Sequence, residues 1–185
     1  MQELNIAIIV GTKRRERESI KIAELIYKVA ESFVGFRPRM IDPLEFDFSK
    51  NDLEPSLSNN NFKKIIEEAD ALLIVVPEYN HSYPAILKRV LDSEYSAYFH
   101  KPVALAGVSS GPWGGVRAIE SILPVLRTLG LIISRQDLNF PNAQDLFDQQ
   151  GNLIIDDKYL KRIEKSLEEL LWLAKTLKWG RENLS

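Results

Sequence analysis

The sequence contains no cysteine and only two histidines, His81 and His100. Without cysteine there are no disulfides, no thiolate metal sites and no cysteine nucleophiles, which fits a reducing cytosol. Two histidines also argue against a histidine-rich metal site, so we expect no bound metal.

Excess basic charge and long apolar runs are missing too. The formal net charge is -2, so no basic field attracts nucleic acid. No apolar run approaches the roughly 20 residues that span a bilayer. The opening stretch MQELNIAIIVGT lacks the basic start, apolar stretch and cleavage site of a signal peptide. We therefore expect a cytoplasmic protein with neither nucleic acid nor membrane as a partner.

What the chain does have is enough apolar material for one core. Its 185 residues are 45% hydrophobic, which suits a single domain over residues 1–185. Five apolar runs predict strands, and segments with helical spacing lie between them. The strands are expected at Ile6–Val10, Phe36–Ile41, Ala71–Val76, Pro102–Gly107 and Leu131–Ser134. Helices are expected after Ser19 as N-cap and at Phe62–Ala69, Ala85–Leu91, Gly115–Leu129 and Lys158–Lys178, with a loop at Leu44–Asn60.

This alternation predicts an α/β fold: a doubly wound, five-stranded parallel sheet with helices on both faces. Ligands of such sheets bind outside the carboxyl ends of the strands, where the strand order reverses. The loops after the first, third and fourth strands are therefore the candidate site.

The first of these loops, GTKRRERES, covers Gly11–Ser19. A helix N-terminus, the hydroxyls of Thr12 and Ser19, and the guanidinium groups of Arg14 and Arg17 suit a phosphate. The alternative is a solvated charged turn in which acidic neighbours neutralise the arginines. The loop fits neither GxxxxGK[ST] nor GxGxxG, which argues against a nucleoside triphosphate or a dinucleotide bound in the usual way.

The second loop, PEYNHSYP, follows the most apolar strand. Tyr79 and Tyr83 can face a flat ring, and the Asn80 amide, with backbone N–H groups from Glu78 to Asn80, suits the edge of a heterocycle. The alternative is an exposed turn whose tyrosines cap the core. Whether His81 or Tyr83 contacts a substrate stays open.

The third loop, SSGPWGG, is rich in glycine, which allows close approach of backbone to a ligand. The alternative is a flexible turn with Trp113 packed on a neighbour. A phosphate site next to sites for a planar polar heterocycle matches the shape of flavin mononucleotide (FMN).

On these motifs the sequence resembles the NADPH-dependent FMN reductase family, of flavodoxin-like fold, over nearly the whole chain. The family patterns G[ST]xR, PEYNxSxPgxLKNaxD and GGxRaxxxLRxxLxxLG appear here as GTKR, PEYNHSYPAILKRVLD and GGVRAIESILPVLRTLG. Ala85 and Arg89 depart from the second pattern, with little effect expected on the ring site. Ser93 follows the pattern where an aromatic is common, which bears on the substrate pocket and subunit contacts rather than on FMN.

The resemblance implies a set of cofactor-binding residues. By this resemblance the phosphate would be bound by Thr12, Arg14, Arg17 and Ser19, and the flavin ring would be lined by Pro77, Glu78, Tyr79 and Asn80. The far edge of the ring would be formed by Ser109, Gly111, Gly114 and Gly115. The candidate set also includes Glu18 and Ser110.

The function implied by the resemblance is hydride transfer from NADPH or NADH to FMN, followed by reduction of a small-molecule acceptor: a flavin, quinone, azo compound or metal ion. No catalytic side chain is expected, because FMN carries the chemistry. A flavodoxin-type electron carrier is an alternative, although carriers are commonly far more acidic. A flavin-binding redox sensor is another. A phosphorylated receiver domain is rejected, because Val10-Gly11 and Pro77 stand where it needs acids.

A homodimer, or a tetramer made of dimers, is also expected. The segment Ile86–Phe99 contains more apolar and aromatic surface than one helix of a two-sided sheet buries, including Leu87, Leu91, Tyr95, Tyr98 and Phe99. The alternative is that all of these side chains belong to the core.

Overall fold

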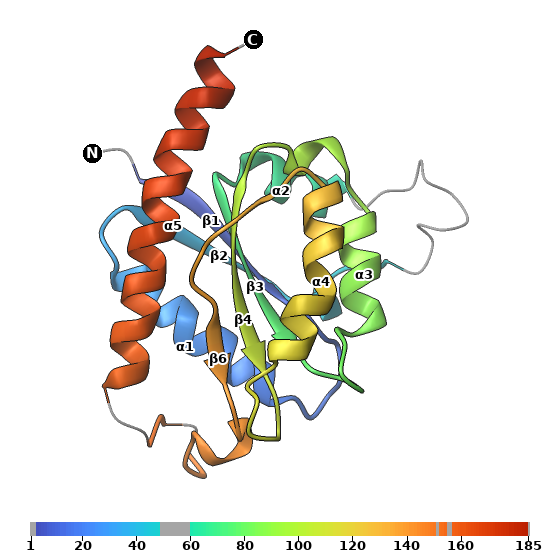
Figure 1. Ribbon diagram of the computed structural model, residues 1–185, viewed down its shortest axis with the longest axis vertical. Coiled ribbons are helices and arrows are strands. Elements are labelled where there is room, and N and C mark those ends of the chain that lie inside the picture. The colour runs from blue at the N-terminus through green and yellow to red at the C-terminus, as the bar shows by residue number, and fades with distance from the viewer. Residues whose placement is uncertain (1–2, 49–59, 151, 155–156, 185) are drawn as a thin grey trace.

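Parallel strands form the centre of the computed structural model, which describes residues 3–48, 60–150, 152–154 and 157–184 (Figure 1). The order in the sheet is β2-β1-β3-β4-β5, and β6 also pairs with β4. This order is that of the flavodoxin-like fold, so the predicted fold class is confirmed. The strands are β1 (Leu4–Val10), β2 (Phe36–Ile41), β3 (Ala71–Pro77), β4 (Pro102–Val108), β5 (Ile132–Ile133) and β6 (Leu138–Phe140).

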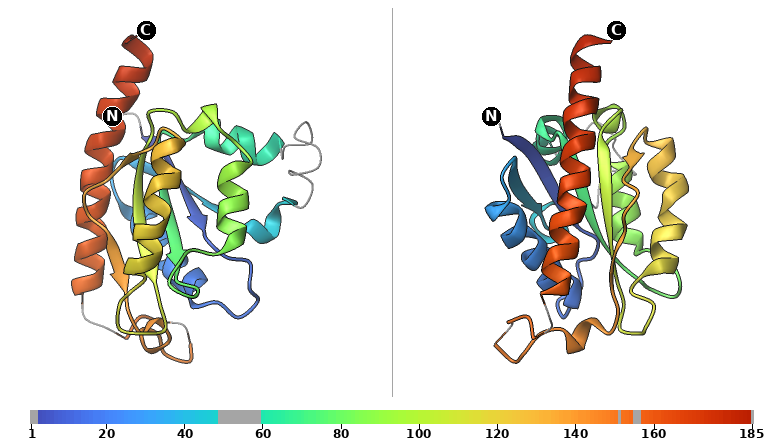
Figure 2. Two further views of the ribbon diagram at one scale, coloured as in Figure 1. Left: turned by 45° about the vertical axis from the view of Figure 1, so that its right-hand side comes forward. Right: turned by 60° about the vertical axis from the view of Figure 1, so that its left-hand side comes forward.

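Helices cover both faces of the sheet (Figure 2). One face packs against α1 (Glu18–Ser32) and α5 (Lys158–Asn183). The other packs against α2 (Asn60–Glu68), α3 (Ala85–Asp92) and α4 (Val116–Thr128).

Strand β3 explains why its sequence is continuously apolar. Leu73 and Val75 point to the core under α1 and α5. Leu72, Ile74 and Val76 point to the opposite core. Successive strand side chains alternate between faces, so a strand covered on both sides has no polar position.

The structure differs from the expected elements in three places. The fifth strand is only two residues long, and β6 continues along the same edge of β4, pairing Leu138 with Ala106. Helix α1 begins at Glu18 with Arg17 at the N-cap position and no side-chain cap hydrogen bond, so Ser19 lies inside the first turn. The expected loop at Leu44–Asn60 contains the end of a 3₁₀ turn at Pro43–Glu45, and Asn60 begins α2; residues 49–59 lie outside the described part.

The carboxyl ends of β1, β3, β4 and β6 meet at one edge of the sheet, at the bottom of Figure 1. The loops after β1, β3, β4 and β6 therefore come together there. In the described residues, no helix is both long and apolar enough to cross a bilayer. Nor do these residues contain a cluster of three or more side chains suited to hold a metal ion.

Candidate functional site

A pocket of about 240 Å³ opens at this carboxyl edge. It lies between the first turn of α1, the end of β3, the end of β4 and the turn after β6. Its walls therefore include all three loops that the sequence singled out. It is lined by Arg14, Glu16, Arg17, Glu18, Ser19, Pro77, Glu78, Tyr79, Val108, Ser109, Ser110, Ala143 and Gln144.

A larger cavity, of about 340 Å³, lies at the opposite edge between β1, β2 and α2. Its charged lining is exposed: the side chain of Arg37 is 73% exposed and lies 3.6 Å from Glu3. It contains none of the loop residues that suit a heterocycle or a phosphate. The smaller pocket is therefore the better candidate, since chemistry rather than volume separates the two.

Arg17 fixes the first loop. Its Nη1 donates to the Thr12 carbonyl at 2.6 Å and to Asp42 Oδ1 at 3.0 Å, and its Nη2 pairs with Asp42 Oδ2. The arginine lines the pocket, but this bidentate pair commits most of its donors. Its main role in the structure is to tie the loop to the end of β2, which differs from the expectation of a guanidinium free for phosphate.

Thr12 and Tyr79 join the first loop to the second. Their hydroxyl oxygens lie 2.8 Å apart. The guanidinium carbon of Arg14 lies 3.7 Å from the centre of the Tyr79 ring, a cation–π contact. One face of the tyrosine is thus covered by arginine and does not face a ligand. Thr12 is buried outside the pocket wall, so it positions Tyr79 rather than lining the cavity.

Ser19 presents an unused donor to the pocket. It is 2% exposed, and its hydroxyl has no hydrogen-bond partner among the described residues. A buried polar atom without a partner is uncommon and calls for an explanation. At the N-terminal turn of a 15-residue helix, the hydroxyl and the helix dipole both suit an anion.

The second loop is a tight hairpin. Tyr79 and Ser82 exchange two backbone hydrogen bonds of 2.8 and 3.0 Å, and the residues between them, Asn80 and His81, have φ of 50° and 65°. This is a two-residue turn of the type that asparagine favours. The Glu78 N–H donates to the Val108 carbonyl. The expected use of the Glu78 and Tyr79 N–H groups for a ligand is therefore wrong, because both are occupied.

Of two residues expected to line the ring, Glu78 lies in the pocket wall and Asn80 does not. Asn80 is exposed and does not line the pocket. The Glu78 carboxylate does line it: Oε1 lies 3.3 Å from Arg117 Nη1, while Oε2 is buried with no hydrogen-bond partner in the described part. Arg117 also lies over Trp113, which is 60% exposed, with its guanidinium carbon 5.5 Å from the ring centre.

The glycines of the third loop serve packing. Gly114 and Gly115 have φ of 59° and 79°, and an added Cβ would lie 2.8 Å from Asn139 Cβ and 2.5 Å from the Val108 nitrogen, respectively. They let the loop approach β4 and β6 rather than a ligand, contrary to expectation. Gly111 has open space around it, but it is also absent from the pocket wall.

Ser109 and Ser110 line the pocket as expected, supported by a segment that the sequence analysis did not single out. The Ala143 N–H donates to the Ser109 carbonyl at 3.0 Å, and Gln144 Nε2 donates to the Ser110 carbonyl at 3.3 Å. Ala143 and Gln144 themselves form part of the wall. Their only sequence signal was the turn-forming Pro141-Asn142 pair, where Asn142 has φ of 47°.

Two parts of the pocket suit different parts of FMN, one its phosphate and the other its ring. The unpartnered Ser19 hydroxyl, the N-terminus of α1 and the nearby Arg14 suit an anion. The unpartnered Glu78 Oε2 suits a donor such as a ring N–H. Thr12, Asn80, Gly111, Gly114 and Gly115 lie outside the wall and support it.

Comparison with known proteins identifies the family of the chain. Residues 4–145 match the family model described as NADPH-dependent FMN reductase. A 2-hydroxy-1,4-benzoquinone reductase of Burkholderia sp is 31% identical over 166 residues, which cover 85% of this chain and 91% of that protein. A quinone reductase of Pseudomonas putida is 29% identical over 161 residues, which cover 82% of this chain and 86% of that protein.

The fold is likewise that of the flavoenzyme FerB, an NAD(P)H:(acceptor) oxidoreductase of Paracoccus denitrificans. The TM-score is 0.77 at 22% identity, with 94% of this chain and 98% of FerB covered. The chain therefore belongs to the NADPH-dependent FMN reductase family and is an FMN-dependent NAD(P)H oxidoreductase with a second acceptor.

Proposed function

We propose that the carboxyl-edge pocket is the FMN site and that quinones are the acceptors. The observation that carries the site is the buried, unpartnered Ser19 hydroxyl in the first turn of α1. We assign the phosphate to Ser19, the helix N-terminus and Arg14. Pro77, Glu78, Tyr79, Ser109 and Ser110, together with Gln144, are assigned to the ring.

Bound FMN would supply the redox chemistry, which is hydride transfer from NAD(P)H and reduction of the acceptor. The protein side chains hold, orient and shield. Arg17 and Asp42 keep the first loop closed behind the phosphate site. Arg117 holds the Glu78 carboxylate at the pocket wall, and the exposed Trp113 stands beside it as a flat surface for a planar acceptor.

Quinones are proposed because two of the related proteins, those of Burkholderia and Pseudomonas putida, are named for quinone reduction. Another relative is named as an NADPH azoreductase. Steady-state assays with a benzoquinone, an azo dye and free FMN would compare kcat/KM for the three classes. We expect the quinone value to be the highest, and a higher value for the azo dye would contradict the assignment.

We also propose a homodimer that works in the cytoplasm. Leu87, Leu91 and Tyr98 of the segment expected at the subunit contact are fully buried in the core. Tyr95 and Phe99 remain 58% and 39% exposed and pack edge-to-face with ring centres 5.0 Å apart. These two rings, rather than the whole segment, are the surface offered to a partner subunit.

The phosphate assignment is tested with FMN and riboflavin, which share a ring and differ in the phosphate. Hydrogen bonds to charged groups contribute about 1.5–3 kcal/mol, and about 1.4 kcal/mol is tenfold in affinity. We expect Ser19→Ala to lower FMN affinity by roughly tenfold or more and to leave riboflavin affinity unchanged. Isothermal titration calorimetry with the apoprotein would measure both.

Ser166→Ala is the matched control. Ser166 is also a fully buried helical serine with no hydrogen-bond partner among the described residues, but it lies in α5, outside the pocket wall. It should change neither affinity. If Ser19→Ala leaves the ratio of FMN to riboflavin affinity unaltered, the phosphate does not bind at this helix.

A further inference from the structure

The outer face of α5 carries two large exposed aromatic side chains. The inner face of this 26-residue helix is buried through residues such as Ile163, Leu167 and Leu170. On the outer face, Trp172 is 64% exposed and Trp179 is 59% exposed. Tryptophan is a frequent anchor of protein interfaces. Within the described chain, nothing covers these two rings.

The exposed residues follow a coiled-coil spacing. Lys165, Glu168, Trp172, Lys175, Trp179 and Glu182 are separated alternately by three and four positions, and all six are exposed. Such a repeat keeps one stripe of a helix facing a partner helix along its length. We call these six residues the α5 stripe.

The α5 stripe is complementary to itself when two copies run antiparallel. In antiparallel pairs, alternate positions of one helix face the intervening positions of the other. With Trp172 facing Lys175 of a second copy, Lys165 faces Glu182 of that copy. The first contact is a cation–π pair and the second an ion pair. The same register places Trp179 opposite Glu168, where the indole N–H can donate to the carboxylate. Two-fold symmetry makes each of these contacts twice. A parallel pair would instead place Lys175 on Lys175 and Glu182 on Glu182.

The body of the protein holds this helix in place. Asp70 Oδ1 lies 3.0 Å from Lys178 Nζ and 3.7 Å from an Arg181 guanidinium nitrogen, and Arg181 Nη1 donates to the His100 carbonyl at 2.8 Å. The C-terminal end of α5 nevertheless projects beyond the sheet in each view (Figures 1 and 2). The α5 stripe is thus presented on a fixed helix, which lowers the entropy lost on association.

Charge argues for a protein partner over a lipid surface. Interfacial helices that bind anionic membranes concentrate lysine and arginine on their polar face. On the α5 stripe, Glu168 and Glu182 alternate with Lys165 and Lys175. We propose that a second copy of this chain packs antiparallel along the α5 stripe, with Trp172 and Trp179 at the centre of the contact.

This contact is independent of the flavin site and of the Tyr95 and Phe99 surface. Stable interfaces bury roughly 1,200–2,000 Å², and a contact made by one helix from each copy is small by that measure. We therefore expect association that depends on concentration over roughly 1–100 µM. Sedimentation velocity of the full chain, followed by mass, would measure it.

A charge exchange provides the decisive test. Lys165→Glu places two acids opposite each other and should halve the mass at a concentration where the wild type is associated. Adding Glu182→Lys restores opposite charges only between copies, because the two positions are 17 residues apart on one helix. The double variant should recover the wild-type mass.

A second test removes the aromatic side chains. The variant with both Trp172→Glu and Trp179→Glu should have half the mass of the associated wild type. Far-UV circular dichroism and the thermal midpoint would confirm that this variant is folded.

Three outcomes would overturn the proposal. The first is a wild-type mass that does not change over the concentration range. The second is a mass that the paired tryptophan substitutions leave unchanged, because all of the association would then belong to another surface, such as that of Tyr95 and Phe99. The third is binding of wild-type protein, but not of the tryptophan variant, to phosphatidylserine vesicles without self-association, which would make the stripe a membrane surface.

Discussion

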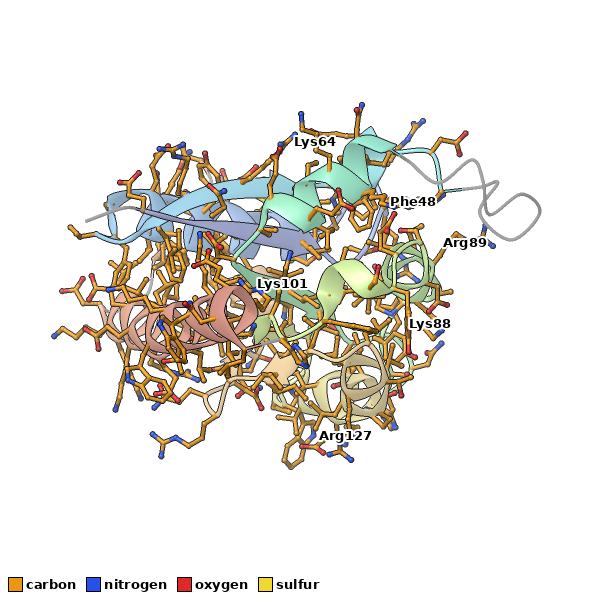
Figure 3. All side chains as sticks on the ribbon, turned by 90° about the horizontal axis from the view of Figure 1, so that it is seen from above. Phe48, Lys64, Lys88, Arg89, Lys101 and Arg127 are labelled. Carbon is orange, nitrogen blue, oxygen red and sulfur yellow. The ribbon has the colours of Figure 1, made fainter. Side chains whose placement is uncertain are left out.

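At the amino end of the sheet, Asp70 lies where β1, β3 and α5 meet, and both of its carboxylate oxygens are used. Oδ2 accepts from the Asn5 N–H at 3.0 Å, and Oδ1 pairs with Lys178 and Arg181. Nearby, Lys101 Nζ donates to carbonyls at the end of α2. Seen from above, Lys101 lies toward the middle of the molecule, whereas Lys64, Lys88 and Arg127 lie at its rim (Figure 3).

At the carboxyl end, two polar groups of the pocket wall lack hydrogen-bond partners among the described residues. The Ser19 hydroxyl and Glu78 Oε2 are buried without hydrogen-bond partners, and Asn80, His81 and Asn142 adopt positive φ. Unpaired buried groups and uncommon backbone conformations cost stability, and they persist where a ligand or a tight turn requires them. The Tyr98 hydroxyl at the amino end is also buried without a partner, so the contrast concerns the charged groups. Both oxygens of Asp70 are paired and stabilise the fold, whereas one oxygen of the buried Glu78 carboxylate has no partner among the described residues.

The largest effect expected from this contrast is at Asp70. Removing one member of a buried ion pair costs about 3–5 kcal/mol. Asp70→Ala should fall near the lower limit, because the side chains of Lys178 and Arg181 are still 28% and 20% exposed and can rehydrate. Urea unfolding would show a lower midpoint with an unchanged slope.

Asp70→Asn is the control, because it keeps an acceptor for the Asn5 N–H. It should lose less stability than Asp70→Ala. FMN affinity should stay at the wild-type value in both variants while they are folded. A large loss of FMN affinity in folded Asp70→Ala would show that the two edges are coupled and would break the comparison.

A smaller effect is expected at Asn80, where backbone conformation rather than ligand contact explains the residue. A left-handed conformation costs about 1–2 kcal/mol for an ordinary L-residue, and glycine avoids this cost. Asn80→Ala should therefore lower the thermal midpoint, while Asn80→Gly should retain it. Neither should change FMN affinity, because Asn80 lies outside the pocket wall. Weaker FMN binding by the stable Asn80→Gly variant would show that the Asn80 side chain contacts the flavin ring.

Much of the fold could be predicted because its strands are apolar on both faces. The runs around Ile8, Leu73 and Ala104 are strands of the central sheet, since nothing but a doubly covered sheet buries every position. Strand β6 was missed for the opposite reason. It is three residues long, carries Asn139 in its middle, and forms only by pairing with β4.

The location of the candidate site could be predicted from the sequence, whereas many of its contacts could not. Parallel strands bring the loops after β1, β3 and β4 to one edge, so local sequence was enough to find Ser19, Glu78 and Ser109. The pairing of Arg17 with Asp42 joins the residue before α1 to the residue after β2 and depends on tertiary packing. Gln144 was missed for the same reason, because its place in the wall depends on where β6 ends.

The third expected effect is confined to alkaline pH and arises at the amino edge. Burial, reinforced by the charge of Arg181, lowers the pKa of Lys101 from 10.5 to about 8, although Asp70 and Glu67 oppose the shift. Between these two values the unfolded chain binds more protons at Lys101 than the folded one, so its contribution to stability rises with pH. Below about pH 8 both states are charged and the contribution is constant.

The variant Lys101→Met isolates the pH-dependent contribution of Lys101 to stability. At each pH, the free energy of unfolding of the variant is subtracted from that of the wild type. Other groups, such as Tyr98, whose burial raises its pKa far above 10, titrate in both proteins and cancel. The difference should be flat from pH 6 to 8 and rise from pH 8 toward 10, whatever constant offset the lost hydrogen bonds to Ile66 and Glu67 introduce. A difference that stays flat through pH 10 would mean that the carbonyls at the end of α2 hold Lys101 charged, and that the amino edge satisfies its ammonium as fully as it satisfies Asp70.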